Sequence, residues 1–342
     1  MRALNRVLFL LFALVLLAVG AVLALFSSWR SERLRTLAAS GEIAVLQTSA
    51  PLEYQTAGNA DGPKLLVSHG APGGYDQGLA LGSLFPDFQT IAPSRPGYLR
   101  TPLSTGLTPE YQADNFDGLL DVLGLDKVVV LGFSAGAPAA IQFAIRQPER
   151  TRALILISPI LQAYSAPPAD KPSGLLGRMF TGEGIPDIAA WGLVESARRD
   201  PSRALAFFID SGNPTSSSNN STATQTLTDP KELAWFRAMV ESVAPMTPRL
   251  PGLRNDIVQL RNLPELPFSR IQAPTLVIAG AGDPDVTPAS LTALQNKLPA
   301  AQVVIIPDAG QWIFLGKPGE TALSACRDFL ETLTPSASNP NP

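Results

Sequence analysis

The clearest candidates for catalytic chemistry in this sequence are Gly132 to Gly136, with the sequence Gly-Phe-Ser-Ala-Gly. This run matches the G-x-S-x-G pattern, in which a serine lies on a sharp turn between a strand and a helix. The two glycines leave room for the turn, which holds the serine in a strained conformation with its hydroxyl exposed. We therefore identify Ser134 as a candidate nucleophile.

The sequence around this motif contains the elements that such a turn needs. Lys127–Leu131 (KVVVL) is typical of a buried strand, and Ala135–Gln147 is typical of a helix. The helix directs its first N–H groups toward the place where an oxyanion would form during acyl transfer. A glycine-rich turn of an unrelated α/β protein is the alternative, but the flanking strand and helix favour a nucleophile.

Strands alternate with helices from Glu42 onward, which predicts an α/β fold with a mostly parallel sheet flanked by helices. The first two expected strands read as an antiparallel pair. Helices are expected at Asp114–Leu123 and from about Thr321 to Leu333. The expected strands are Ile43–Gln47, Leu52–Gln55, Lys64–Ser68, Gln89–Ala92, Lys127–Leu131, Ala153–Ile157, Thr275–Ala279 and Val303–Ile306.

More than 110 residues separate the strand ending at Ile157 from the strand beginning at Thr275. Such a stretch is far longer than an ordinary connection, so we expect an inserted helical cap of about residues 160–270. Five aromatic residues of this cap are candidates for an apolar substrate pocket. They are Trp191, Phe207, Phe208, Trp235 and Phe236.

Two further turns follow expected strands: His69–Gly74 (HGAPGG) and Ser94–Tyr98 (SRPGY). Together with the Ser134 turn they resemble the α/β-hydrolase superfamily, and the likeness runs from about Glu42 to Leu333. Ser94 and Leu99 depart from the family's D-x-R-G-x-G turn. The resemblance implies an oxyanion hole made by the backbone N–H groups of Ala71 and Ala135. It also implies that His69 holds its loop in place, and a catalytic role for His69 is the alternative.

In this family the triad follows the order serine, acid, histidine. Gly280–Pro288 (GAGDPDVTP) resembles the acid loop, which implies that Asp283 is the triad acid, with Asp285 as the alternative. Val303–Trp312 resembles the closing loop that carries the histidine. At the histidine position, however, this chain has Gln311.

This substitution removes the group that would accept the serine proton. A glutamine amide can hydrogen-bond to Ser134 and to Asp283, but it does not titrate near neutral pH. His69 is the only histidine in the chain and would need a rearranged loop to replace the missing base. Asp283 or Asp285 acting through a water is another possibility, although an exposed carboxylate with a pKa near 4 is a poor base.

Composition excludes several other classes of protein. The net charge is −3 with a pI near 5.3, so the chain has no basic field for nucleic acid. One cysteine and one histidine exclude an intrachain disulfide framework, a thiolate cluster and a two-imidazole metal site. The chain has no Walker loop and no dinucleotide fingerprint. We therefore expect a small-molecule substrate and neither a cofactor nor a metal.

The N-terminus contains 20 residues without a charge, Val7 to Phe26, enough helix to cross a bilayer of about 30 Å. We expect a single-pass anchor with the bulk domain exported, and a signal peptide cleaved near Ala18–Gly20 is the alternative. The predicted organisation is an anchor and stalk at residues 1–35, a hydrolase domain at 36–333 and a disordered tail at 334–342.

Two functions compete on these residues. The first is a serine hydrolase that acts on a small ester, amide or lipid-like substrate through Ser134. The second is a catalytically impaired pseudo-hydrolase that binds a small ligand or a partner, which would account for Gln311. We favour the hydrolase, because an inert descendant has no need to keep the strained serine turn and both of its glycines.

Overall fold

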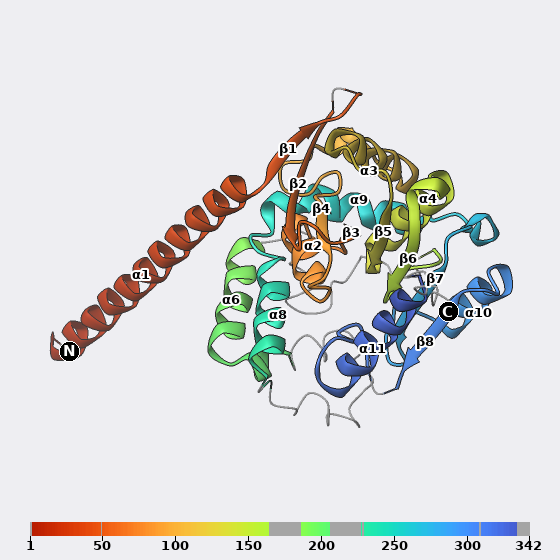
Figure 1. Ribbon diagram of the computed structural model, residues 1–342. Helices are drawn as coiled ribbons and strands as arrows, with labels where there is room; N and C mark the ends of the chain where they lie inside the picture. Colours follow the sequence, from red (N-terminus) through yellow and green to blue (C-terminus); the bar gives the residue numbers. More distant parts are fainter. Residues whose placement is uncertain are drawn as a thin grey trace, which may run out of the picture.

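The computed structural model describes residues 2–48, 50–163, 186–205, 227, 229–307 and 309–333. Eight strands form one sheet in the order β1-β2-β4-β3-β5-β6-β7-β8 (Figure 1). β2 pairs antiparallel with both β1 and β4, and all the other pairs are parallel. The mostly parallel sheet and the antiparallel first pair were predicted, whereas the antiparallel pairing of β2 with β4 was not. The strands are β1 (Glu42–Val45), β2 (Pro51–Gly58), β3 (Lys64–Ser68), β4 (Gln89–Pro93), β5 (Val128–Phe133), β6 (Thr151–Ile157), β7 (Thr275–Gly280) and β8 (Gln302–Ile306).

Helices cover both faces of this sheet, so the central strands are buried on both sides. In β5, Val129 and Leu131 belong to one hydrophobic core, whereas Val128 and Val130 belong to the other. Alternate residues of a strand point to opposite faces, which explains the continuous apolar runs. The first core contains residues of α2 (Tyr75–Gly82) and α11 (Gly316–Thr332), and the second contains residues of α3 (Pro109–Leu123), α4 (Ala137–Arg146) and α10 (Pro288–Lys297).

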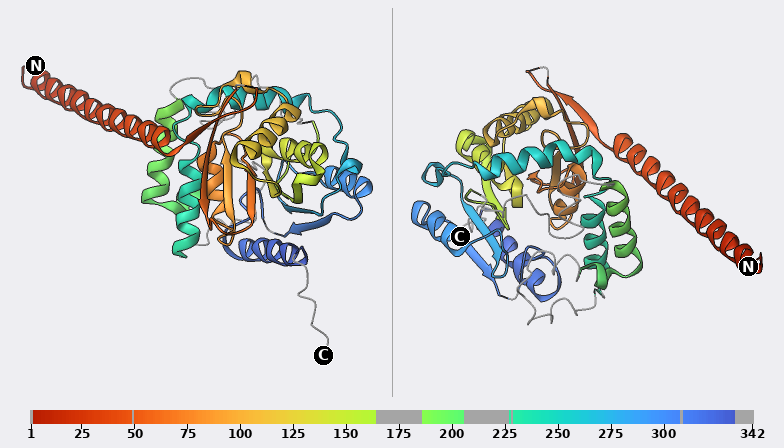
Figure 2. Two further views of the ribbon diagram at one scale, coloured as in Figure 1. Left: turned by 45° about the horizontal axis from the view of Figure 1, so that its top comes forward. Right: turned by 180° about the vertical axis from the view of Figure 1, so that it is seen from behind.

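Between β6 and β7 the described residues are largely helical. We call residues 160–270 the insertion; its described α-helices include α6 (Pro186–Arg199), α8 (Pro230–Glu241) and α9 (Leu250–Arg261). α6 and α8 lie side by side, and α8 packs on α2 (Figures 1 and 2). α8 begins where the Asp229 side chain accepts a hydrogen bond from the Lys231 N–H, with Pro230 at the first helical position. Phe207, Phe208 and the predicted tail at 334–342 lie outside the described residues.

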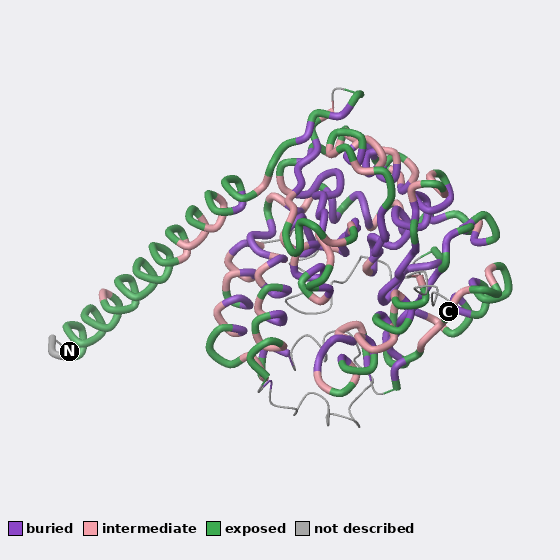
Figure 3. The backbone as a smooth tube through the Cα atoms, in the orientation of Figure 1, coloured by how far each residue is buried: buried purple, intermediate pink, exposed green. Residues whose placement is uncertain are grey.

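The chain begins with one long helix, α1 (Arg2–Ser40). Its N-terminal part projects away from the domain and exposes its apolar side chains, as Figures 2 and 3 show. By length and composition it can cross a membrane, a property that it shares with signal sequences. The predicted boundary between residues 35 and 36 falls inside this helix. Its C-terminal end packs on the domain, where Leu37 is only 5% exposed.

Candidate active site

Ser134 lies at the end of β5, on the turn that leads into α4. Its φ angle is +49°, a conformation that is strained for a residue other than glycine. A 3₁₀ turn over Ser134–Gly136 connects the strand to the helix. A Cβ at Gly136 would lie 2.3 Å from the backbone oxygens of Ser68 and His69, so only glycine fits there. The strained serine turn predicted from the motif is therefore present.

The Gln311 amide reaches the candidate nucleophile. Its Nε2 donates a hydrogen bond to the Ser134 Oγ over 3.1 Å. Ser134 as a whole residue is 5% exposed, and the Gln311 side chain contacts its hydroxyl. Gln311 thus contacts the candidate nucleophile as a hydrogen-bond donor.

The loop after β3 faces this turn and is held by Gln77. The Gln77 Oε1 accepts from the Gly70 N–H at 2.8 Å, and its Nε2 donates to the Pro72 carbonyl at 2.9 Å. Between these two contacts, the Ala71 N–H has no hydrogen-bond partner in the described part of the chain. Ala135 is in the first turn of its helix, where N–H groups lack partners within the helix. Sequence reasoning missed Gln77, because a polar residue in a short helix has no distinctive pattern.

His69 is fully buried and both of its ring nitrogens are engaged by the backbone. The Nδ1 contacts the Gly70 carbonyl at 2.7 Å, and the Nε2 accepts from the Arg95 N–H at 3.0 Å. Burial, reinforced by the positive charges of Arg95 and Arg249, holds the pKa of His69 well below its ordinary value. The imidazole is therefore neutral at pH 7, carries its proton on Nδ1 and has no nitrogen free to serve as a base.

Asp283 follows β7 and is 5% exposed. Its Oδ1 accepts from the Asp285 N–H at 3.0 Å, whereas its Oδ2 is buried and has no partner in the described part of the chain. Burial raises the pKa of Asp283 from 3.8 to about 6, although the Asp285 N–H that donates to it and the nearby Ser158 hydroxyl lower it. The expectation of an exposed carboxylate with a pKa near 4 is therefore wrong for Asp283.

The acid loop and the closing loop lie side by side. The Gly282 N–H donates to the Ala309 carbonyl at 2.8 Å. The Ser158 Oγ donates to the Gln311 carbonyl at 3.4 Å, a contact at the long limit for a hydrogen bond. The residues that the sequence assigned to one site therefore come from neighbouring strand ends, at the carboxyl edge of the sheet.

Only some of the described aromatic side chains of the insertion lie near this edge of the sheet. Trp235 and Phe236 pack edge-on against Trp312, the neighbour of Gln311, with ring centroids 6.3 and 5.8 Å apart. Trp191 packs instead against α1, 5.8 Å from the Phe26 ring. Two of the three described pocket candidates thus lie near the closing loop. The described residues contain no cluster of three or more side chains suited to a metal ion.

Comparisons with known proteins add to this geometry. A family model described as alpha/beta hydrolase fold matches residues 63–318. The uncharacterized hydrolase YcgS of Bacillus subtilis is 34% identical over 117 residues, which are 34% of this chain and 40% of that protein. A pimeloyl-(acyl-carrier protein) methyl ester esterase of Nitrosomonas europaea is 26% identical over 287 residues, which cover 82% of this chain and 100% of that esterase. An alpha/beta hydrolase fold protein from Nakamurella multipartita superposes with a TM-score of 0.75 and 26% identity, over 85% of this chain and 99% of that one.

Proposed function

The chain belongs to the alpha/beta hydrolase fold family, and on that premise we propose that it is a serine hydrolase of small ester, amide or lipid-like substrates. The observation that carries this proposal is Ser134, held at a φ of +49° with the Gln311 amide 3.1 Å from its hydroxyl. A protein that only binds a ligand needs no strained residue at this point. The curated relatives include an esterase of a methyl ester, which supports a carboxylic ester as substrate.

Asp283 is the base in this proposal. In this scheme Asp283 takes the Ser134 proton by way of intervening water, while the Ser134 Oγ forms a bond to the substrate carbonyl carbon. The Ala71 and Ala135 N–H groups donate to the resulting oxyanion. When the tetrahedral intermediate collapses, Asp283 returns the proton to the leaving alkoxide or amine. A second water then attacks the acyl-enzyme by the same route and releases the acid and Ser134.

Gln311 positions the serine oxygen in this scheme. Its amide donates to the Ser134 Oγ and stabilises negative charge that develops there during attack. It cannot take up a proton at neutral pH. We therefore expect turnover well below that of an enzyme with a complete triad, in the range that oxyanion stabilisation and a water-mediated base supply.

The membrane is the proposed location of this activity. Most of the apolar side chains from Val7 to Leu25 are exposed along α1, and together they form a surface far larger than the isolated apolar side chains of soluble surfaces. We propose that this segment spans a membrane, with the hydrolase domain on the extracytoplasmic side. Such a location suits a lipid-like substrate.

Covalent labelling with a fluorophosphonate tests the proposed activity. The full chain in nonionic detergent is expected to form one adduct, located at Ser134 by peptide mass spectrometry. Ser134→Ala is expected to form none. If the natural protein stays unlabelled and Gln311→His becomes labelled, the chain is a disarmed hydrolase, and the alternative of a ligand-binding protein replaces the proposal.

The pH dependence of kcat/KM tests the base. We expect activity to rise with pH around a midpoint near 6 and to stay flat up to pH 8, because only the ionised form of Asp283 accepts a proton. The Asp285 charge raises the pKa of Asp283, so Asp285→Asn is expected to move the midpoint to lower pH. Ester hydrolysis between pH 4.5 and 8.5 supplies both profiles. A natural profile that is flat through pH 6 contradicts the assignment of Asp283 as the base.

A further inference from the structure

The C-terminal part of α1 presents one face to the domain. Arg30, Arg33 and Leu37 lie three and four residues apart and therefore share this face. The Arg30 Nε donates to the Asp187 Oδ2 at 2.6 Å. Leu37 is buried, and its carbonyl accepts from the Tyr75 hydroxyl at 2.8 Å. This part of the helix is thus a docked element of the domain and not a free stalk.

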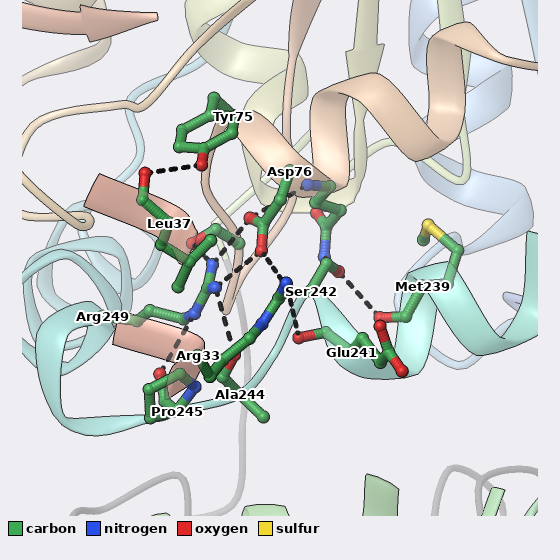
Figure 4. Close-up of polar contacts among 12 residues, drawn as sticks. Arg33, Leu37, Tyr75, Asp76, Met239, Glu241, Ser242, Ala244, Pro245 and Arg249 are labelled. Atoms are coloured by element: carbon green, nitrogen blue, oxygen red, sulfur yellow. Dashed lines mark hydrogen bonds and ion pairs between the residues drawn. The ribbon is translucent and has the colours of Figure 1, made fainter. Parts of the chain in front are cut away.

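Arg33 is the member of this face that reaches toward the active site. Its Nη2 donates to the Asp76 Oδ2 at 3.0 Å (Figure 4). The same carboxylate receives both terminal nitrogens of Arg249, at 3.0 and 2.8 Å. The Arg249 side chain is fully buried, and those of Asp76 and Arg33 are 13% and 22% exposed. Ion pairs so shielded from water are stronger than exposed ones.

One further hydrogen bond of Arg249 goes to the loop that carries Ala71, and its others go to the Pro245 and Ala244 carbonyls. Its Nη1 donates to the Gly73 carbonyl at 2.7 Å. A Cβ at Gly74 would lie 2.8 Å from this nitrogen, so the loop closes on the guanidinium only because that residue is glycine. Gln77, which holds Gly70 and Pro72, follows Asp76 directly in α2. The Asp76 carboxylate therefore sits between α1 and the loop, and Arg249 bonds to both the carboxylate and the loop.

A second chain of contacts leads from α1 to the same arginine. Asp187, the partner of Arg30, is 4% exposed and accepts from the Thr247 N–H with its Oδ1 at 2.7 Å. Thr247 begins the 3₁₀ turn that ends with Arg249. Arg30 thus acts on the turn that contains Arg249, and Arg33 acts on the carboxylate that fixes the Arg249 guanidinium.

We propose that Arg33 is a positioning residue of the hydrolase: it holds Asp76 and, through Arg249, the loop that offers the Ala71 N–H to the oxyanion. This inference rests on the proposed function, because it assigns the loop a role in the same reaction. It makes the docked part of α1, which continues the apolar segment, a component of the catalytic apparatus.

Arg33→Ala is the test substitution, and Arg35→Ala is its matched control. Arg35 lies on the same helix, is 75% exposed, forms an ion pair with Glu32 and donates to the Ser31 carbonyl. After loss of Arg33, Asp76 still pairs with Arg249, so we expect the chain to fold. Asp76 itself is unsuitable, because its removal would leave the buried Arg249 without its carboxylate.

Arg33→Ala is expected to lower kcat, and the rate of Ser134 labelling, by about two- to thirtyfold, the range of coupling between linked sites. KM should stay within about twofold. Arg33→Lys, which keeps the charge but not the forked geometry, is expected to fall between the alanine variant and the natural protein. Arg35→Ala should match the natural protein.

Hydrogen–deuterium exchange of the full chain in detergent supplies a readout that needs no activity. Arg33→Ala is expected to speed exchange of the amides at residues 70–76, and Arg35→Ala to leave it unchanged. Equal exchange in the two variants overturns the inference even if the enzyme is active. Faster exchange in Arg33→Ala alone, in a chain that no fluorophosphonate labels, supports the positioning role and rejects the proposed function.

Discussion

Gln311→His is expected to raise ester turnover by about 10²- to 10⁴-fold, the usual contribution of a well-placed general base. The natural amide already lies 3.1 Å from the Ser134 Oγ, so an imidazole at this position can reach the serine proton. In the proposed site Asp283, whose Oδ2 has no hydrogen-bond partner in the described part of the chain, would accept the imidazole Nδ1–H and fix its tautomer. On the proposed assignment, the substitution would complete a Ser-His-Asp arrangement with Ser134 and Asp283.

The measurement is kcat for a p-nitrophenyl ester of a short acid, with Gln311→Ala as the control. The alanine variant removes the amide without adding a base, so it should be slower than the natural protein. A histidine variant no faster than the alanine variant would show that Asp283 does not orient an imidazole here. In that event the Gln311 amide itself is integral to the natural mechanism.

Asp283→Asn is expected to have opposite effects on activity and on stability. Turnover should fall by about 10²- to 10⁴-fold, because the amide cannot take up the serine proton. The protein should become more stable at pH 8. The pKa of Asp283 is about 6 in the folded chain against 3.8 ordinarily, so folding favours the protonated carboxyl. That contribution to stability is complete below pH 4 and lost as pH rises through 6.

The pKa shift corresponds to an increase in the free energy of unfolding of Asp283→Asn of up to roughly 3 kcal/mol at pH 8, and of almost nothing at pH 4. Thermal unfolding midpoints at both pH values measure it. Ser134→Ala is the control, since it removes activity without changing a buried charge. A lower unfolding midpoint for Asp283→Asn at pH 8 would mean that contacts in the folded protein stabilise the charged carboxylate. The pKa of Asp283 would then not be raised, which contradicts the basis for its proposed role.

The sheet was predictable from sequence because its central strands are short, continuous apolar runs. Helices with less regular patterns were not. α2 contains two glycines in eight residues, and α10 buries only Ser290, Leu291 and Leu294. α3 was placed too late, at Asp114, although Thr108 and Pro109 carry a usable start signal: the Thr108 hydroxyl caps the helix and Pro109 takes its first position.

In the candidate site, local sequence patterns predicted the serine turn, and the family resemblance pointed to Asp283 and Gln311. Neither predicted the polar network around Asp76. Arg33 and Asp76 are 43 positions apart, and Asp76 and Arg249 are 173 apart. Such pairings depend on tertiary packing and leave no periodicity in the sequence. The predicted stalk contains Arg30 and Arg33, and both form ion pairs with buried or largely buried carboxylates of the domain.

α1 is one continuous helix, so its apolar part and its docked part move together. An α-helix of 39 residues is about 58 Å long, and this one has no hinge between its apolar part and Arg33. A spanning helix adjusts its tilt to the thickness of the surrounding bilayer. With residues 7–26 embedded as we propose, such a tilt would be transmitted along a rigid rod to the Asp76 carboxylate. The rate of the enzyme would then depend on bilayer thickness, and no ligand would be needed for this effect.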